Sequence, residues 1–156
     1  MKIKWSQAII WILVLQVIGL TLGVMTKDNI ASWYQLLHKS PLTPPSLIFS
    51  IVWPILYVMI ALAGYFLWSR RKDPDAKIAF YFYSTQLIMN WAWTPLFFQL
   101  HCLGLSFIWI LFLTLLTLIT IYLTKTKFKF ACYMLVPYFL WLIFASYLNG
   151  TIWMMN

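Results

Sequence analysis

Residues 33–68 read WYQLLHKSPLTPPSLIFSIVWPILYVMIALAGYFLW, and this stretch decides the fold. As far as Pro45 it is polar and rich in proline; beyond that it is an unbroken apolar run that carries Trp53 and Tyr57 one helical turn apart. A water-soluble protein would not join such a loop to so much apolar surface. The stretch therefore predicts a loop, able to act as a lid, that leads into a membrane helix.

Composition indicates the same environment. Hydrophobic residues make up 63% of the chain and charged residues only 9%, whereas about a quarter of the residues in soluble domains are charged. The length of 156 residues allows several spans but no separate soluble domain. The net charge of +8 does not indicate nucleic-acid binding, because the basic residues lie in short gaps between apolar runs.

Five apolar runs are long enough to cross a hydrocarbon core of about 30 Å. They cover residues 5–25, 46–68, 78–98, 103–124 and 130–153, and none contains Lys, Arg, Asp or Glu. The first run is longer than the apolar part of a signal peptide, and no small-residue cleavage site follows it. We therefore predict an all-α polytopic membrane protein, in which residues 1–156 form a single bundle of five transmembrane helices.

The basic residues predict the topology. Five spans place the termini on opposite sides, and of the 11 basic residues only Lys27 and Lys39 share the side of the first loop. The other side receives Lys2, Lys4, Arg70, Arg71, Lys72, Lys77, Lys125, Lys127 and Lys129. Because cytoplasmic loops carry the excess of Lys and Arg, we expect the N-terminus in the cytoplasm and the first loop and C-terminus outside a bacterial cell membrane. Cys102 and Cys132 then lie at opposite faces, so no disulfide is expected.

The outward loop, residues 26–45, is long for a compact bundle. Asp28 or Asn29 can cap a short helix within it, which carries Ile30, Trp33, Tyr34 and Leu37 on one apolar side. Two interpretations are compatible with this pattern. The helix covers a binding site as a lid, or it lies among the lipid headgroups, anchored by Trp33 and Tyr34.

Small residues and proline mark the first two spans. Gly19 and Gly23, with three residues between them, allow another helix to approach closely, inside the bundle or across a dimer. In the second span Trp53 and Tyr57 share a face with Ala61, Gly64 and Trp68. Pro54 removes a backbone hydrogen bond beside Trp53 and predicts a kink there.

The third span combines amides with aromatic rings. Gln86, Asn90, Trp93 and Phe97 recur at helical spacing, so they share one face. An amide that faced lipid would be costly, which directs this face into the bundle. There the amides either join helices by hydrogen bonds or, in the case of Asn90, bind a ligand within an aromatic cage.

The fifth span adds a further wall. Trp141, Ala145 and Leu148 share a face that follows Pro137, and the small Ala145 leaves space at its centre. At 1.5 Å per residue, Trp53, Asn90 and Ala145 all lie roughly 10 to 12 Å below the outer membrane face. Three helices are therefore expected to line one pocket beneath the first loop.

Four ordered motifs extend this interpretation. The segments WY with KSPLTPP, FSIVWPILY, QLIMNWAWTPLFF, and PYFLW with ASYLN resemble the TspO/MBR family of tryptophan-rich sensory and translocator proteins over nearly the whole chain. The resemblance implies a five-helix bundle, commonly dimeric, that binds porphyrins and benzodiazepine-type ligands. Three positions depart from the family pattern: Leu42 replaces an aromatic residue, Ser40 separates Lys39 from Pro41, and Pro54 follows Trp53.

The resemblance and the residue patterns together define the expected site. The family motifs place Trp33, Trp53, Asn90, Trp93, Trp141, Ala145 and Leu148 around the ligand, and Tyr34 and Tyr57 lie beside them on the same helical faces. Lys27, His38 and Lys39 are expected at the rim, where they would meet the propionates of a porphyrin. His38 and His101 are expected to be solvated loop residues rather than haem ligands.

These features favour a membrane receptor or sensor that binds porphyrin as a ligand and needs no obligatory cofactor. Its expected role is in tetrapyrrole homeostasis or stress signalling. The alternatives are light-dependent porphyrin breakdown, and passive transport or scaffolding of porphyrins. The chain shows no metal-ligand cluster, nucleophile with a base, or paired carboxylates, so we expect neither a metal site nor catalytic residues. The sterol-type pattern Leu62, Tyr65, Arg70 is common by chance in such a composition, and we predict no specific sterol role.

Overall fold

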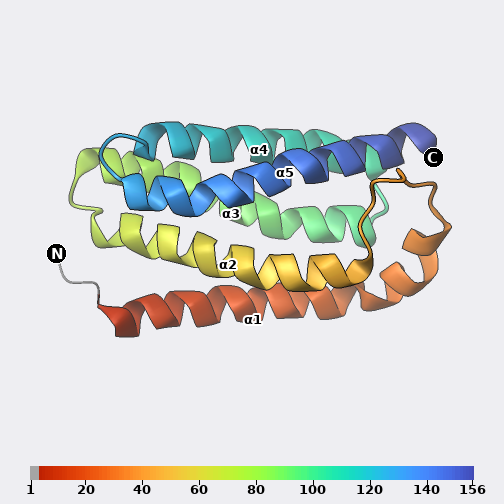
Figure 1. The fold of residues 1–156 in the computed structure, drawn as a ribbon, viewed down its shortest axis with the longest axis horizontal. Helices are drawn as coiled ribbons and strands as arrows, with labels where there is room; N and C mark the ends of the chain where they lie inside the picture. Colours follow the sequence, from red (N-terminus) through yellow and green to blue (C-terminus); the bar gives the residue numbers. More distant parts are fainter. Residues whose placement is uncertain (1–3) are drawn as a thin grey trace.

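The computed structural model describes residues 4–156 and contains five long antiparallel helices (Figure 1). They are α1 (Trp5–Asn29), α2 (Ser46–Ser69), α3 (Pro74–Phe98), α4 (Leu103–Thr124) and α5 (Lys129–Met155). α5 packs against α2 and α4, α3 packs against α4, α2 and α1, and α1 packs against α2. The predicted five-helix, all-α bundle is confirmed.

Four of the helices are long and apolar enough to cross a membrane: α1 with its extension to Tyr34, α2, α4 and α5. α3 has a comparable length of 25 residues but buries Gln86 and Asn90 and carries Asp75 in its first turn. α1 is the most peripheral helix, with only Ala8, Leu15 and Thr26 buried. Its outer side chains are apolar, as expected for a surface that faces lipid.

The bundle has two chemically different ends. At the end that holds the start of α1 and the α2–α3 and α4–α5 turns lie Lys4, Arg70, Arg71, Lys72, Lys77, Lys125, Lys127 and Lys129, and we call it the basic end. At the other end, the loop end, lie Lys27, Lys39, the connection between α1 and α2, and the C-terminus (Figure 1). The predicted sorting of basic residues onto one end is confirmed for these eight; Lys2 lies outside the described residues.

The expected short helix with its own cap is wrong. α1 continues beyond Met25 to Asn29 and through a π-helical turn at Ile30–Tyr34, and Asn29 has helical dihedral angles with no capping hydrogen bond. No proline or glycine lies between Gly23 and Pro41 to stop the helix. The irregular connection therefore shrinks to residues 37–45, and the π-helical turn changes the direction of the side chains that follow it.

Aromatic rings fill the spaces left by two glycines. A Cβ atom on Gly19 would come within 2.5 Å of the Tyr57 ring, and one on Gly64 would overlap the Tyr83 ring. Gly23 faces open space. Gly19 therefore serves packing inside the bundle, one of the two roles considered for the glycine pair. It makes room for the Tyr57 side chain of α2 and not for the backbone of α2.

α3 begins four residues earlier than predicted because Asp73 caps it. The Asp73 carboxylate accepts a hydrogen bond from the backbone N–H of Asp75 at 3.0 Å, and Pro74 occupies the first helical position. Lys127, from the α4–α5 turn, forms ion pairs with Asp73 at 2.7 Å and with Asp75 at 3.0 Å. These contacts join the two turns at the basic end.

We expect Asp73→Asn to make stability less sensitive to acid. The hydrogen bond from Lys127 lowers the pKa of Asp73 below its ordinary 3.8. The ionised carboxylate therefore stabilises the folded state above about pH 4, and this stabilisation is lost as the pH falls through the lowered pKa. Thermal unfolding in detergent between neutral and acid pH checks this, with Asp28→Asn as the control because Asp28 forms no ion pair within residues 4–156. Equal acid sensitivity in wild type and Asp73→Asn would contradict the assignment.

Candidate functional site

Asn90 lies at the centre of the bundle and joins three helices. Its Nδ2 donates to the Tyr138 hydroxyl of α5 at 2.9 Å, and its Oδ1 accepts from the Tyr57 hydroxyl of α2 at 3.3 Å. All three side chains are buried. The structural alternative for Asn90, a hydrogen bond between helices, is thus present, and its role in ligand binding stays a prediction.

These hydrogen bonds do not compare the depths of the three helices. They join the ends of the side chains, and a tyrosine hydroxyl lies well away from its own Cα atom. The expectation that Trp53, Asn90 and Ala145 share one level stays a prediction.

Three half-buried tryptophans lie three or four residues nearer the loop end than the members of the Asn90 group on the same helices. Trp53 packs against Tyr57, Trp93 stacks on Phe97 with ring centroids 5.0 Å apart, and Trp141 meets Phe49 edge to face. The indole N–H groups of Trp93 and Trp141 are buried without an acceptor among residues 4–156. Buried indole N–H groups ordinarily have a hydrogen-bond acceptor. Because these two have none in the described part of the protein, they can donate to a bound molecule.

Sequence reasoning missed Asn149. Its side chain is 3% exposed, and neither its amide nitrogen nor its amide oxygen has a hydrogen-bond partner among residues 4–156. It lies four residues beyond Ala145 and eight beyond Trp141, so the three share one stripe of α5. An asparagine within an apolar span at this spacing was the signal that could have identified it.

Ala145, Leu148 and Pro54 are further predicted residues of α5 and α2. Ala145 is partly buried and packs against the core, and Leu148 is buried. Pro54 lies inside α2, and its carbonyl accepts a hydrogen bond from the Gln16 side chain of α1 at 2.7 Å. The backbone beside Trp53 is therefore tied to α1.

Trp33 and Tyr34 lie over the end of α3. Trp33 stacks on His101 with ring centroids 3.9 Å apart and meets Phe97 edge to face, and Tyr34 packs against Phe97 and Phe98. His101 has a positive φ of 53° in the α3–α4 turn. Phe97 therefore connects Trp33 and Tyr34 directly to Trp93.

The three expected rim residues have different surroundings. The Lys39 ammonium donates to the carbonyl oxygens of Tyr34, Gln35 and Leu37, at 2.7, 3.3 and 2.9 Å, and so closes the end of the helical extension. The His38 backbone N–H donates to Asn156 Oδ1, and Asn156 Nδ2 donates to the His38 carbonyl, both at 3.0 Å. Lys27 is exposed on α1. Lys27 therefore lies at the surface, whereas the Lys39 side chain and the His38 backbone form hydrogen bonds.

The connection between α1 and α2 is fastened to α5 at two points. One is the pairing of His38 with Asn156, and the other is a hydrogen bond between the Ser40 and Tyr147 hydroxyls at 2.9 Å. Ser40 also accepts from the Leu42 backbone N–H at 3.1 Å and is buried. Ser40, which separates Lys39 from Pro41, thus attaches the loop to the end of the bundle.

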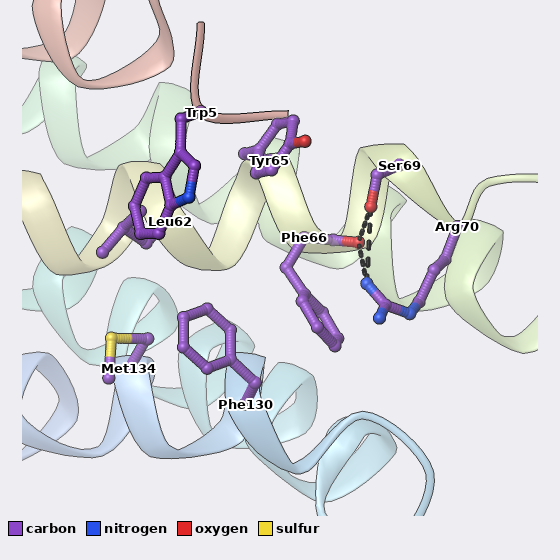
Figure 2. Close-up of a pocket in the computed structure, with 8 residues that line it drawn as sticks. All are labelled: Trp5, Leu62, Tyr65, Phe66, Ser69, Arg70, Phe130 and Met134. Atoms are coloured by element: carbon purple, nitrogen blue, oxygen red, sulfur yellow. Dashed lines mark hydrogen bonds between the residues drawn. The ribbon is translucent and has the colours of Figure 1, made fainter. Parts of the chain in front are cut away.

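Two cavities lie at the basic end, and neither is lined by a predicted ligand-binding residue. One, of about 250 Å³, lies between the start of α1, α2 and α5 (Figure 2). The other, of about 330 Å³, is an open depression beside Tyr122 and Lys127. Within residues 4–156, no three His, Cys, Asp or Glu side chains gather as metal ligands, and Cys102 and Cys132 are both free.

Comparison with known proteins agrees with the fold and the motifs. The model of the TspO/MBR family matches residues 11–154. The tryptophan-rich protein TspO of Archaeoglobus fulgidus is 32% identical over 93% of this chain and 94% of its own length. The sheep translocator protein is 32% identical over 80% of this chain and 75% of its own length, and TspO of Bacillus cereus is 30% identical over 80% and 81%. This integral membrane protein therefore belongs to the TspO/MBR family.

Proposed function

We propose that the protein is a membrane receptor or sensor that binds a porphyrin at the loop end, between α2, α3 and α5. The observation that carries the proposal is the set of buried, unpartnered polar groups on Trp93, Trp141 and Asn149. Each leaves a hydrogen-bonding group out of water without compensation, which costs free energy unless a ligand supplies the partner. Asn90 would support this site by holding the three helices together.

A porphyrin suits this surface chemically. It is a flat aromatic molecule, and tryptophan rings favour offset or edge-to-face contacts with such systems. Its propionates are acceptors for the indole N–H groups of Trp93 and Trp141 and for the Asn149 amide. The rest of the lining is apolar, as is usual for small-molecule sites with a few placed polar groups.

The connection between α1 and α2 would act as the lid of this site. Trp33 and Tyr34 cover Phe97, and the hydrogen bonds of Ser40 and His38 hold the loop against α5. Entry of a ligand requires these few polar contacts to open, which is a small cost beside that of separating helices.

We also propose the complete topology and assembly. α3 crosses the membrane together with the four apolar helices, because it is as long as they are and lies against α1, α2 and α4. The basic end faces the cytoplasm, since cytoplasmic loops carry the excess of Lys and Arg. The loop end and the C-terminus then lie outside a bacterial cell membrane, and the protein forms the homodimer common in its family.

Titration of protoporphyrin IX, followed by the absorption of the pigment, tests the site. We expect Trp141→Phe, which removes an N–H but keeps an aromatic ring, to weaken binding about three- to ten-fold. Trp53→Ala should have an effect of about the same size, because it removes a ring that would contact the ligand. The matched control is Trp68→Phe, near the basic end, with affinity unchanged. If Trp68→Phe weakened binding as much as Trp141→Phe, the pigment would not occupy the loop end.

The same complex separates binding from the other candidate activities. Under illumination, a receptor returns the porphyrin unchanged, whereas photo-oxidative breakdown produces a new absorbing species in the presence of oxygen. In vesicles, passive movement equilibrates the porphyrin without an ion gradient, as expected for spans that carry no ionisable coupling residue.

A further inference from the structure

The cavity at the basic end is an apolar cleft with one charged residue at its mouth. Figure 2 shows Trp5 and Leu62 on one side, Phe130 and Met134 opposite, and Phe66 between them and Arg70. Its volume of about 250 Å³ exceeds that of an apolar cavity that holds a benzene-sized group, about 150 Å³. The walls come from α1, α2 and α5, so the cleft is built by the tertiary fold.

Arg70 has hydrogen-bonding capacity to spare. Its guanidinium lies 3.4 Å from the Phe66 ring centroid, and one nitrogen donates to the Phe66 carbonyl at 3.3 Å and the Ser69 hydroxyl at 3.4 Å. A guanidinium has five N–H donors. Asp73 and Asp75, the acidic residues nearest in sequence, are both paired with Lys127, and Arg70 makes no ion pair within residues 4–156. The remaining donors therefore lack an anionic partner.

We propose that this cleft binds one anionic phospholipid, with the phosphate on the Arg70 guanidinium and part of an acyl chain against Leu62, Phe130 and Met134. Arginine pairs with phosphate through two parallel hydrogen bonds, and the cleft supplies the apolar surface beside that charge. The neighbouring Arg71, Lys72 and Lys129 raise the local concentration of anionic lipid.

The polar contacts at the cleft favour a phosphate over a hydroxyl headgroup. Tyr65, which also lines the cleft, already accepts a hydrogen bond on its hydroxyl from the Lys4 backbone N–H at 2.9 Å. Leu62, Tyr65 and Arg70 of the sterol-type pattern thus line one cavity, and the groups left there are donors: the Tyr65 O–H and the charged Arg70 guanidinium. An anion with an apolar tail fits that requirement.

Native mass spectrometry tests the proposal on the full chain in detergent, with phosphatidylglycerol, phosphatidylcholine of the same acyl chains, and inorganic phosphate. We expect one phosphatidylglycerol per chain, held more tightly than phosphatidylcholine. Arg70→Gln should weaken phosphatidylglycerol binding about ten-fold or more, because hydrogen bonds to a charged group are lost. The control Arg71→Gln should lose about five-fold or less, the contribution of one surface charge.

A second variant tests the apolar part of the site. Met134→Trp fills the cleft without changing charge, and Leu62→Phe fills it less drastically; either should reduce phosphatidylglycerol retention while helical content is unchanged. Equal losses in Arg70→Gln and Arg71→Gln would reduce the site to diffuse surface attraction. Full competition by inorganic phosphate, or undiminished binding in both cleft variants, would overturn the lipid assignment. None of these residues belongs to the proposed porphyrin site, so failure here leaves that site untouched.

Discussion

Replacing Asn149 with leucine will raise the stability of the ligand-free protein and weaken its binding of protoporphyrin IX. Both atoms of the Asn149 amide are buried without a partner among residues 4–156, and an unsatisfied buried group costs about 1 to 3 kcal/mol. Leucine has a similar shape and no polar atoms, so it removes that cost. If the amide serves the porphyrin, the same change removes a ligand contact and lowers affinity about three- to ten-fold.

Unfolding in mixed micelles and pigment titration on the same samples measure the two effects. A variant that gained stability and kept full affinity would exclude Asn149 from the site. A variant that lost stability would contradict the assignment of an uncompensated cost to the buried Asn149 amide. The opposite signs expected for stability and binding separate this prediction from a general disruption of the bundle, which would lower both.

The identical substitution at Asn90 will have the opposite effect on stability. Asn90→Leu leaves the hydroxyls of Tyr57 and Tyr138 without their partner in the buried centre of the bundle. We expect a loss of about 1 to 3 kcal/mol, since hydrogen bonds within membranes are individually modest and two are affected. Mixed-micelle unfolding of the two Asn→Leu variants side by side compares a satisfied with an unsatisfied amide.

A triple variant provides the control for Asn90. Changing Tyr57 and Tyr138 to phenylalanine together with Asn90→Leu removes every member of the group, so no buried polar atom of the group is left unpaired. Most of the lost stability should return. If the triple variant stays as unstable as Asn90→Leu alone, packing around Asn90 rather than its hydrogen bonds is what joins the helices.

The fold could be predicted well because it depends on strong one-dimensional patterns. Apolar runs of membrane length and the uneven distribution of Lys and Arg defined five helices and sorted their ends. The faces of α3 were also predicted correctly, since Gln86, Asn90 and Phe97 are buried as their spacing required. The start of α3 lies outside the apolar run, because Asp73 and Pro74 form a polar helix start that hydrophobicity does not mark.

The candidate site was predicted less completely, for a physical reason. Residue type and spacing selected aromatic rings whose role in binding stays a prediction, and Tyr138 was missed although it completes the hydrogen bonds of Asn90. Likewise, the role of Lys39 in closing a helix end depends on a π-helical turn that no simple periodicity indicates. Such pairings depend on how neighbouring helices are staggered.

The amino-acid sequence alone determined that the protein lies in a membrane, how many helices it has and to which family it belongs. Hydrophobicity and ordered motifs are properties of consecutive residues. Only the tertiary structure decided which buried polar groups are satisfied, as at Asn90, and which are left without a partner, as at Asn149. A hydrogen bond between helices requires two atoms to lie within about 3 Å, and that distance follows from helix rotation and stagger, which residues distant in the chain set together.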